Sequence, residues 1–168
     1  MQEPNTAHAA DLPLPRIIAD SREKDPLTFA HLESVRGTLH TGDYSIQRLT
    51  SRFAVERKSV ADLVSSLTRA RQRFIRELER MRGMDFARLL IVGSPCDLAA
   101  HLASRAVSAA SILGSLEAVN TRLVPVVWAP TPQHAALAVE RWACYFYAGA
   151  AKAWGTVCIP AWCRENAI

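Results

Sequence analysis

The stretch that most constrains the fold runs from Phe53 to Asp62. Residues 53–58 alternate as on a β-strand, with Phe53, Val55 and Arg57 on one face and Ala54, Glu56 and Lys58 on the other. The apolar start predicts inward packing, so the polar end of the second face must lie at a site or in solvent. Ser59-Val60-Ala61-Asp62 matches a capping box, in which a serine and an acid satisfy free backbone N–H groups. A strand leading directly into a helix is therefore expected.

Acidic residues near the end of this strand predict a metal site. Asp43, within Gly42-Asp43-Tyr44, fits the preceding antiparallel strand and can meet Glu56 and Lys58. Two carboxylates hold a hard cation such as Mg²⁺ through oxygen ligands. A lysine can orient or help deprotonate the attacking water, or neutralise charge as the bond breaks. This combination is typical of metal-assisted phosphodiester cleavage. Asp62 is either a further acid of that site, only a helix cap, or both.

The helix expected after Ser59 extends to about Met81 and has two unlike faces. Its apolar stripe comprises Val60, Leu63, Val64, Leu67, Phe74, Leu78 and Met81. The opposite face carries Asp62 and four arginines, Arg69, Arg73, Arg76 and Arg80. Such a row predicts contact with DNA phosphates, and the alternative is a solvated face partly neutralised by Glu77 and Glu79. A break within residues 68–72 would change the phase of the second half.

The remaining pattern is that of an α/β protein with antiparallel strands first and βα units later. Strands are expected at residues 16–20, 39–49, 86–92 and 123–128, and helices at 27–35, 97–103, 108–121 and 131–151. Residues 1–15 form an expected flexible leader, 16–152 a single domain and 153–168 a tail.

Composition favours an anionic partner and a cytoplasmic protein. The 168 residues carry a formal net charge of +4. The four cysteines have no metal-ligand spacing and are interpreted as reduced thiols. The N-terminal residues do not resemble a secretory signal, and no apolar run reaches the ~20 residues of a membrane span. The expected location is cytoplasmic, and nucleoid-associated if the source is prokaryotic.

The ordered motifs resemble the XPF family of structure-specific DNA endonucleases. The family signature stands here as Gly42-Asp43 followed by Glu56-Arg57-Lys58-x-x-x-Asp62. Asp20-Ser21-Arg22-Glu23 resembles the upstream D-x-R-E element, and Arg73-Phe74-x-x-Glu77 resembles the helix segment after the signature. The resemblance covers about residues 16–150.

This resemblance implies a restriction-endonuclease-like three-layer fold with a central mixed β-sheet flanked by helices. It implies Mg²⁺ or Mn²⁺ as cofactor and cleavage of branched or flapped DNA during repair or recombination. Asp43 and Glu56 would be metal ligands, with Asp20 close to the metal or the scissile phosphate. Lys58 would be the catalytic lysine, and the site would be completed by Arg22, Glu23, Arg57 and Asp62.

The chain also departs from the family pattern. The tandem helix-hairpin-helix domain usual in the family does not follow the nuclease unit, and Thr68-Arg69-Ala70-Arg71 stands where Asp-Gly is frequent. Grip on DNA would then come from the chain's own arginines, from a homodimer or from a partner protein. Two alternatives remain: a non-catalytic DNA-binding or scaffolding subunit of the same fold, and a junction-resolving nuclease. Inactive copies lose the acids or the lysine, whereas Asp20, Asp43, Glu56 and Lys58 are all present.

Overall fold

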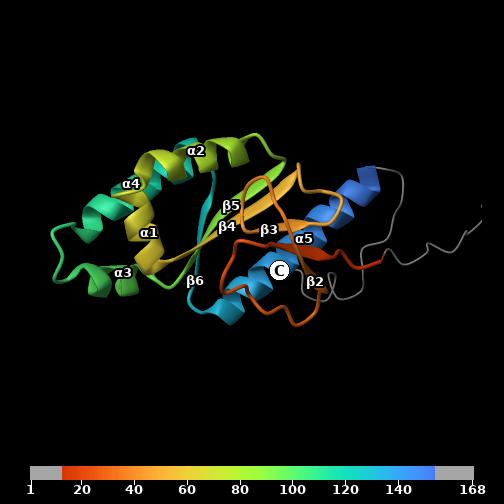
Figure 1. The fold of residues 1–168 in the computed structure, drawn as a ribbon, viewed down its shortest axis with the longest axis horizontal. Coiled ribbons are helices and arrows are strands. Elements are labelled where there is room, and N and C mark those ends of the chain that lie inside the picture. The colour runs from red at the N-terminus through yellow and green to blue at the C-terminus, as the bar shows by residue number, and fades with distance from the viewer. Residues whose placement is uncertain (1–12, 154–168) are drawn as a thin grey trace, which may run out of the picture.

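A computed structural model describes residues 13–153, which fold into one sheet with helices on both faces (Figure 1). The strands are β1 Ile17–Asp20, β2 Ser34–Gly37, β3 Tyr44–Ile46, β4 Phe53–Ser59, β5 Phe86–Val92 and β6 Val126–Ala129. The helices are α1 Val60–Leu67, α2 Arg71–Arg82, α3 Pro95–Leu102, α4 Ala109–Arg122 and α5 Pro132–Ala153. None of the helices within this part of the chain is both long and apolar enough to cross a bilayer.

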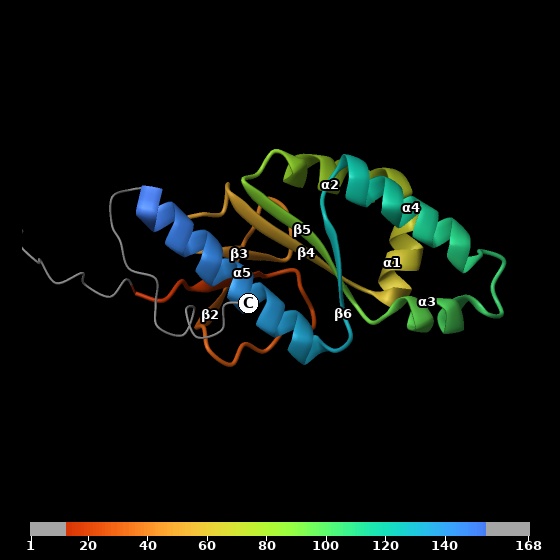
Figure 2. The same ribbon diagram turned by 180° about the vertical axis from the view of Figure 1, so that it is seen from behind.

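The sheet is mixed, with strand order β2-β1-β3-β4-β5-β6. Strands β1, β3 and β4 pair antiparallel, whereas β4, β5 and β6 are parallel to one another, as are β1 and β2. Helices α1 to α4 cover one face and α5 covers the other, as the two opposite views show (Figures 1 and 2). This arrangement confirms the expected three-layer fold with a central mixed sheet.

Strand β4 contributes to both cores because its side chains alternate. Phe53 and Val55 pack in the cluster beneath α5, and Ala54 packs in the cluster beneath α1 to α4. The ring of Phe53 stacks on Phe86 at a centroid distance of 4.6 Å, and Phe146 of α5 lies 5.5 Å away. The expected inward packing of the strand's start is therefore confirmed, and its last residues emerge at the edge of both cores.

The helix expected over residues 27–35 is wrong. Residues 27–33 form an irregular segment that leads into β2. Their backbone is held by side chains from elsewhere: the Tyr44 hydroxyl accepts from the Leu27 N–H at 2.8 Å, and Glu140 of α5 accepts two further N–H groups. Because these long-range bonds replace helical ones, the local pattern does not predict the segment. The strand expected over 39–49 is confined to β3.

The long helix expected after Ser59 is divided at Thr68–Ala70, where its sequence already indicated a possible break. The apolar stripe nevertheless faces the core beneath these helices: its members are buried there, except Val60, which is partly buried and packs against the same cluster. Cys96 is exposed, and Cys144 is buried in the core beneath α5. Cys158, Cys163, the leader up to residue 12 and the tail beyond Ala153 lie outside the described residues.

Glu140 is a buried acid that ties α5 to the segment before β2. Its side chain is 1% exposed, and Oε1 accepts the backbone N–H groups of His31 at 2.6 Å and Leu32 at 2.9 Å. A carboxylate in this position satisfies two donors that no strand or helix pairs. Glu140 therefore fixes the connection between β1 and β2.

We predict that Glu140→Ala lowers the free energy of unfolding by about 2–4 kcal/mol, because it leaves two N–H groups without an acceptor. Glu140→Gln retains a carbonyl acceptor and should cost less. Denaturant unfolding measures both, with Glu117→Ala on the exposed face of α4 as the control. Equal stability of the Glu140→Ala and Glu117→Ala variants would contradict the assigned role.

Candidate functional site

The Gly42-Asp43 turn lies directly against β4. The Asp43 N–H donates to the Val55 carbonyl at 2.8 Å, and the Arg57 N–H donates to Asp43 Oδ2 at 2.8 Å. Asp43 therefore bonds to the main chain on both sides of Glu56, at Val55 and at Arg57. Gly42 has φ +76°, and a Cβ there would lie 3.2 Å from both the Ala54 Cβ and the Val55 oxygen. The glycine permits the close approach that brings Asp43 to the strand.

Glu56 and Lys58 point from β4 toward the side of α1 and α2. Lys58 Nζ donates to Glu56 Oε1, and the Glu56 side chain is only 3% exposed. Glu56 Oε2 is buried and has no hydrogen-bond partner among the described residues. A buried carboxylate oxygen without a partner is costly, which points to a ligand that it would bind.

The charges of Asp43, Glu56 and Lys58 change one another's pKa values. Burial, with the added charge of Asp43, raises the pKa of Glu56 to about 8 despite the opposing charge of Lys58. Burial also raises the pKa of Asp43 to about 6, against opposing effects of Lys58 and the Arg57 N–H. For Lys58, burial favours the neutral amine, but Glu56 and Asp43 outweigh it and raise the ammonium pKa above its usual value. Crowded acids with raised pKa values beside a charged lysine are typical of a functional site.

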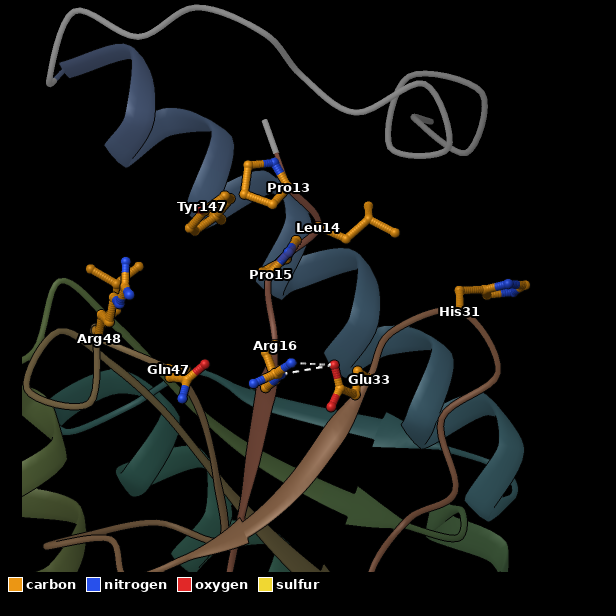
Figure 3. Close-up of a pocket in the computed structure, with 10 residues that line it drawn as sticks. Pro13, Leu14, Pro15, Arg16, His31, Glu33, Gln47, Arg48 and Tyr147 are labelled. Atoms are coloured by element: carbon orange, nitrogen blue, oxygen red, sulfur yellow. Dashed lines mark hydrogen bonds and ion pairs between the residues drawn. The ribbon is translucent and has the colours of Figure 1, made fainter. Parts of the chain in front are cut away.

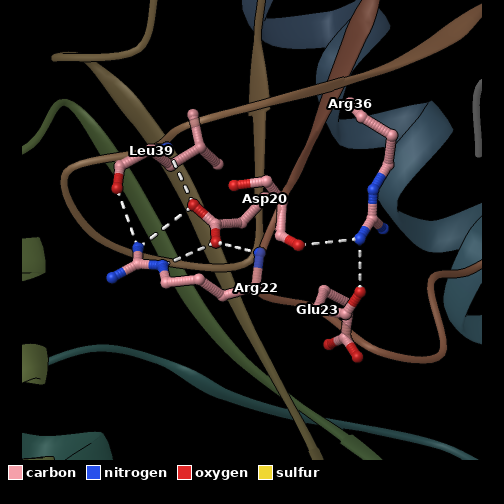
Figure 4. Close-up of polar contacts among 6 residues, drawn as sticks. Asp20, Arg22, Glu23, Arg36 and Leu39 are labelled. Carbon is pink, nitrogen blue, oxygen red and sulfur yellow. Dashed lines mark hydrogen bonds and ion pairs between the residues drawn. The ribbon is translucent and has the colours of Figure 1, made fainter.

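Asp20, at the end of β1, is fully engaged by neighbouring donors (Figure 4). Oδ1 accepts the N–H and Nε of Arg22 at 2.8 and 2.7 Å, and Oδ2 accepts Arg22 Nη2 at 3.1 Å and the Leu39 N–H at 2.7 Å. Burial alone would raise the pKa of Asp20, but these bonds lower it to about 2. Asp20 is therefore an ionised anchor that fixes the guanidinium of Arg22.

The turn after β1 is held by two more arginines. Arg36 of β2 donates Nη2 to the carbonyls of Ser21 at 3.0 Å and Glu23 at 2.6 Å (Figure 4). Arg57 lies on the opposite strand face from Glu56, and its Nη1 donates to the Asp25 carbonyl at 2.6 Å. Arg36 was not predicted, because the helix expected over residues 27–35 ended just before it and no strand was expected at β2.

These elements enclose an open hollow of about 490 Å³. Every predicted catalytic or metal-binding residue except the buried Glu56 lines it, namely Asp20, Arg22, Glu23, Asp43, Arg57, Lys58 and Asp62. Glu77 of α2 also lines the hollow and was not among the predicted site residues. Its signal in the sequence was its place in Arg73-Phe74-x-x-Glu77.

Asp62 takes part in both the helix cap and the hollow. Its N–H donates to Ser59 Oγ at 3.1 Å, and the Ser59 hydroxyl donates to Asp62 Oδ2 at 2.7 Å. A capping box also requires a bond from the Ser59 N–H to the acid, and none is described at the start of α1. At the start of α3, by contrast, Ser94 and Asp97 make both bonds. The carboxylate of Asp62 thus remains at the rim of the hollow.

The predicted DNA-binding arginines are exposed, but they do not form one group. Arg69, Arg73 and Arg76 line a shallow hollow of about 550 Å³ at the break between α1 and α2, together with Arg71. Arg80 lies near the end of α2 and does not line that hollow.

A larger hollow of about 670 Å³ lies at the other end of β1 and β3 (Figure 3). Its charged pair is already satisfied, since Arg16 donates to Glu33 at 2.6 and 2.9 Å. Arg48, Gln47 and Tyr147 complete its rim without an acid and lysine cluster. The chemistry therefore favours the smaller hollow beside β4 as the candidate active site.

Comparisons with known proteins agree with this architecture. Two solved structures of XPF from Aeropyrum pernix, one of them a complex with DNA, each match with a TM-score of 0.62. Their sequence identities to this chain are 21% and 19%, so they establish the fold alone. The matches cover 77% and 79% of this chain, which spans 60% and 65% of the length of theirs. Among curated proteins, no significant match is found.

The family itself is established by sequence. The model of the ERCC4 domain family matches residues 16–141, which include every residue of the hollow beside β4. With the motif, the fold and this match in agreement, the chain belongs to the ERCC4 domain family.

Proposed function

We propose that this chain is a divalent-metal-dependent DNA endonuclease that hydrolyses phosphodiester bonds in branched or flapped DNA. The observation that carries the proposal is the buried, unpartnered Oε2 of Glu56 beside Asp43 and Lys58, two residues that line an open hollow. Family membership and the fold of the XPF structures support it. Repair or recombination of DNA is the corresponding process.

The residues present fit Mg²⁺ or Mn²⁺. Within residues 13–153, no three His, Cys, Asp or Glu side chains are arranged as a ready-made metal cage. Mg²⁺ does not need one, because it is usually held by one or two carboxylates and keeps several waters. Each of the two proposed ligands has one oxygen without a described partner, Oε2 of Glu56 and Oδ1 of Asp43. These two oxygens would hold the ion. Its chemical contribution would be Lewis-acid stabilisation and a lower pKa for an attacking water.

The chain's own groups divide the remaining work. The raised pKa of Lys58 keeps it an ammonium, which favours orienting water and neutralising charge over acting as a base. Arg22 is held by Asp20 and by the Leu39 carbonyl at 2.8 Å, so its guanidinium is fixed at the hollow to bind a phosphate. Asp20, with both oxygens engaged, positions Arg22, and its direct role as a metal ligand stays a prediction.

Arg69, Arg73 and Arg76 would extend the contact with the DNA backbone away from the hollow. A homodimer or a partner protein would add grip. The same chemistry suits a junction-resolving nuclease, whereas a non-catalytic DNA-binding subunit would not require the charged cluster to be intact. A panel of labelled flap, fork, four-way junction and linear duplex substrates with Mg²⁺, beside a mass measurement in solution, separates these outcomes.

We predict Mg²⁺-dependent cleavage, and we expect Asp43→Ala or Lys58→Ala to lower its rate by at least about 10²-fold. The first change removes a proposed ligand of the ion, and the second removes a positive charge beside the reacting phosphate. Circular dichroism and unfolding curves check that both variants fold. Asp85→Asn, on the exposed surface beside Arg52, is the control and should cleave as the wild type does. Undiminished cutting by both site variants would refute the assigned site.

Stability without metal should fall as pH rises from about 4 to about 8. The raised pKa values of Asp43, about 6, and Glu56, about 8, mean that the folded state keeps protons that the unfolded state has released. That contribution is complete below about pH 4 and is lost as pH rises through both values. Asp20, with its pKa lowered to about 2, stays ionised from about pH 4 to about pH 8, so its contribution to the free energy of unfolding changes little in this range.

Unfolding measured in EDTA at several pH values tests this dependence. Asp43→Asn should flatten it, because it removes one titrating group and a charge that raises the Glu56 pKa. Saturating Mg²⁺ should restore stability at the alkaline end by binding the ionised acids. A metal-free wild type that is equally stable at pH 5 and pH 8 would contradict the raised pKa values.

Arg73→Gln combined with Arg76→Gln should weaken DNA binding and reduce the slope of log K against log salt by about 2, one unit for each arginine that no longer binds a phosphate. Fluorescence anisotropy over a salt series measures the slope. Arg48→Gln, at the rim of the larger hollow at the far end of β1 and β3, is the matched control. A slope unchanged by the double substitution would assign these arginines to solvent.

A further inference from the structure

Lys58 meets α2 as well as Glu56. Its Nζ lies 5.6 Å from the centroid of the Phe74 ring, within the range of a cation–π contact. Phe74 itself is 3% exposed and packs in the core beneath α1 and α2. The ring is therefore a fixed surface for the ammonium.

Glu77 follows Phe74 by three residues and shares its side of α2. It is half-buried and lines the hollow with Lys58. Its negative charge favours the protonated form of Lys58 and raises the pKa values of Asp43 and Glu56, so it lies close to all three.

The Glu77 carboxylate stands out among the acids that line the hollow. Asp20, Glu23, Asp25, Asp43 and Asp62 each engage a described residue through a hydrogen bond or an ion pair. Within residues 13–153, no such contact engages Glu77. It lies in the interior of α2, so it does not cap the helix. Its charge acts on the cations Arg22 and Lys58 as well as on the acids of the hollow.

Glu56 has two roles that conflict. Its carboxylate accepts the Lys58 ammonium and is also the proposed ligand of the divalent ion. A doubly charged cation at Oε2 of Glu56 would repel the Lys58 ammonium at Oε1 and would weaken the attraction of this carboxylate for the lysine. Lys58 then needs another anion within reach, and the Asp62 and Asp43 carboxylates are already bonded to Ser59 and Arg57.

We propose that Phe74 and Glu77 are the positioning pair of Lys58: the ring supports the ammonium, and the Glu77 carboxylate accepts it when Glu56 binds the metal. This inference rests on the proposed metal-dependent function. Lys58 would thereby keep its place and charge beside the phosphate instead of turning away from the cation.

The test compares Glu77→Gln with Glu79→Gln, a matched change on the exposed face of the same helix. Glu77→Gln should lower kcat by about 10- to 100-fold, as loss of an outer partner of a metal site does, with little change in KM for DNA. Mg²⁺ affinity measured by calorimetry should change little, and Glu79→Gln should match the wild type in every measurement.

A double-mutant cycle provides a readout other than activity. Unfolding of wild type, Lys58→Met, Glu77→Gln and the double variant gives the coupling between the two residues. The coupling should increase on addition of Ca²⁺ or Mg²⁺, because Lys58 then bonds to Glu77. Ca²⁺ allows the measurement without turnover.

Four results would overturn the inference. An unchanged kcat would remove Glu77 from the mechanism, whereas a large loss of Mg²⁺ affinity with normal kcat at saturating Mg²⁺ would make it a metal ligand instead. A coupling that does not respond to the cation would exclude the change of partner. If the wild type binds no divalent ion by calorimetry, both this inference and the proposed function fail. If it binds and cleaves normally, only the inference is at stake.

Discussion

The structure depends on accommodating one acidic side chain inside a sheet. Glu56 lies in β4 with neighbours on both sides, and its pKa is raised by burial. Lys58, two residues further along the strand, donates to Oε1 of Glu56, and Oε2 is left without a partner. A purely structural strand would place an apolar residue there, as it does at Phe53 and Ala54. The exception therefore marks the point at which the strand stops supporting a core and begins to form a site.

The surrounding elements place further acids and bases around Glu56. The Gly42-Asp43 turn uses the backbone of Val55 and Arg57 to fix a second acid over the strand. Asp20 is neutralised separately by Arg22 and the Leu39 N–H, so it adds an anchored guanidinium to the hollow. Two acids with raised pKa values and one with a lowered pKa thus lie around one hollow, because the donors are distributed unequally among them.

The sequence predicts the parts of this arrangement that depend on local periodicity. Alternation in residues 53–58 placed Glu56 and Lys58 on one face of β4, and the apolar stripe of residues 60–81 predicted the buried sides of α1 and α2. It failed for β2, whose preceding segment is held by Tyr44 and Glu140 from far along the chain. It also missed Glu77, because its position depends on how α2 resumes after the break. Such long-range contacts have no periodic signature.

The charge around the hollow sets the order in which ligands would bind. Its acids outnumber its four basic residues, Arg22, Lys24, Arg57 and Lys58. A DNA phosphate approaching this surface without a cation would meet net repulsion, whereas the arginines at the break between α1 and α2 attract it without acidic neighbours in their own hollow. Under the proposed function the two surfaces would complement each other. The arginines would hold the DNA backbone in advance, and the hollow beside β4 would accept a phosphate only after a cation had reversed its local charge.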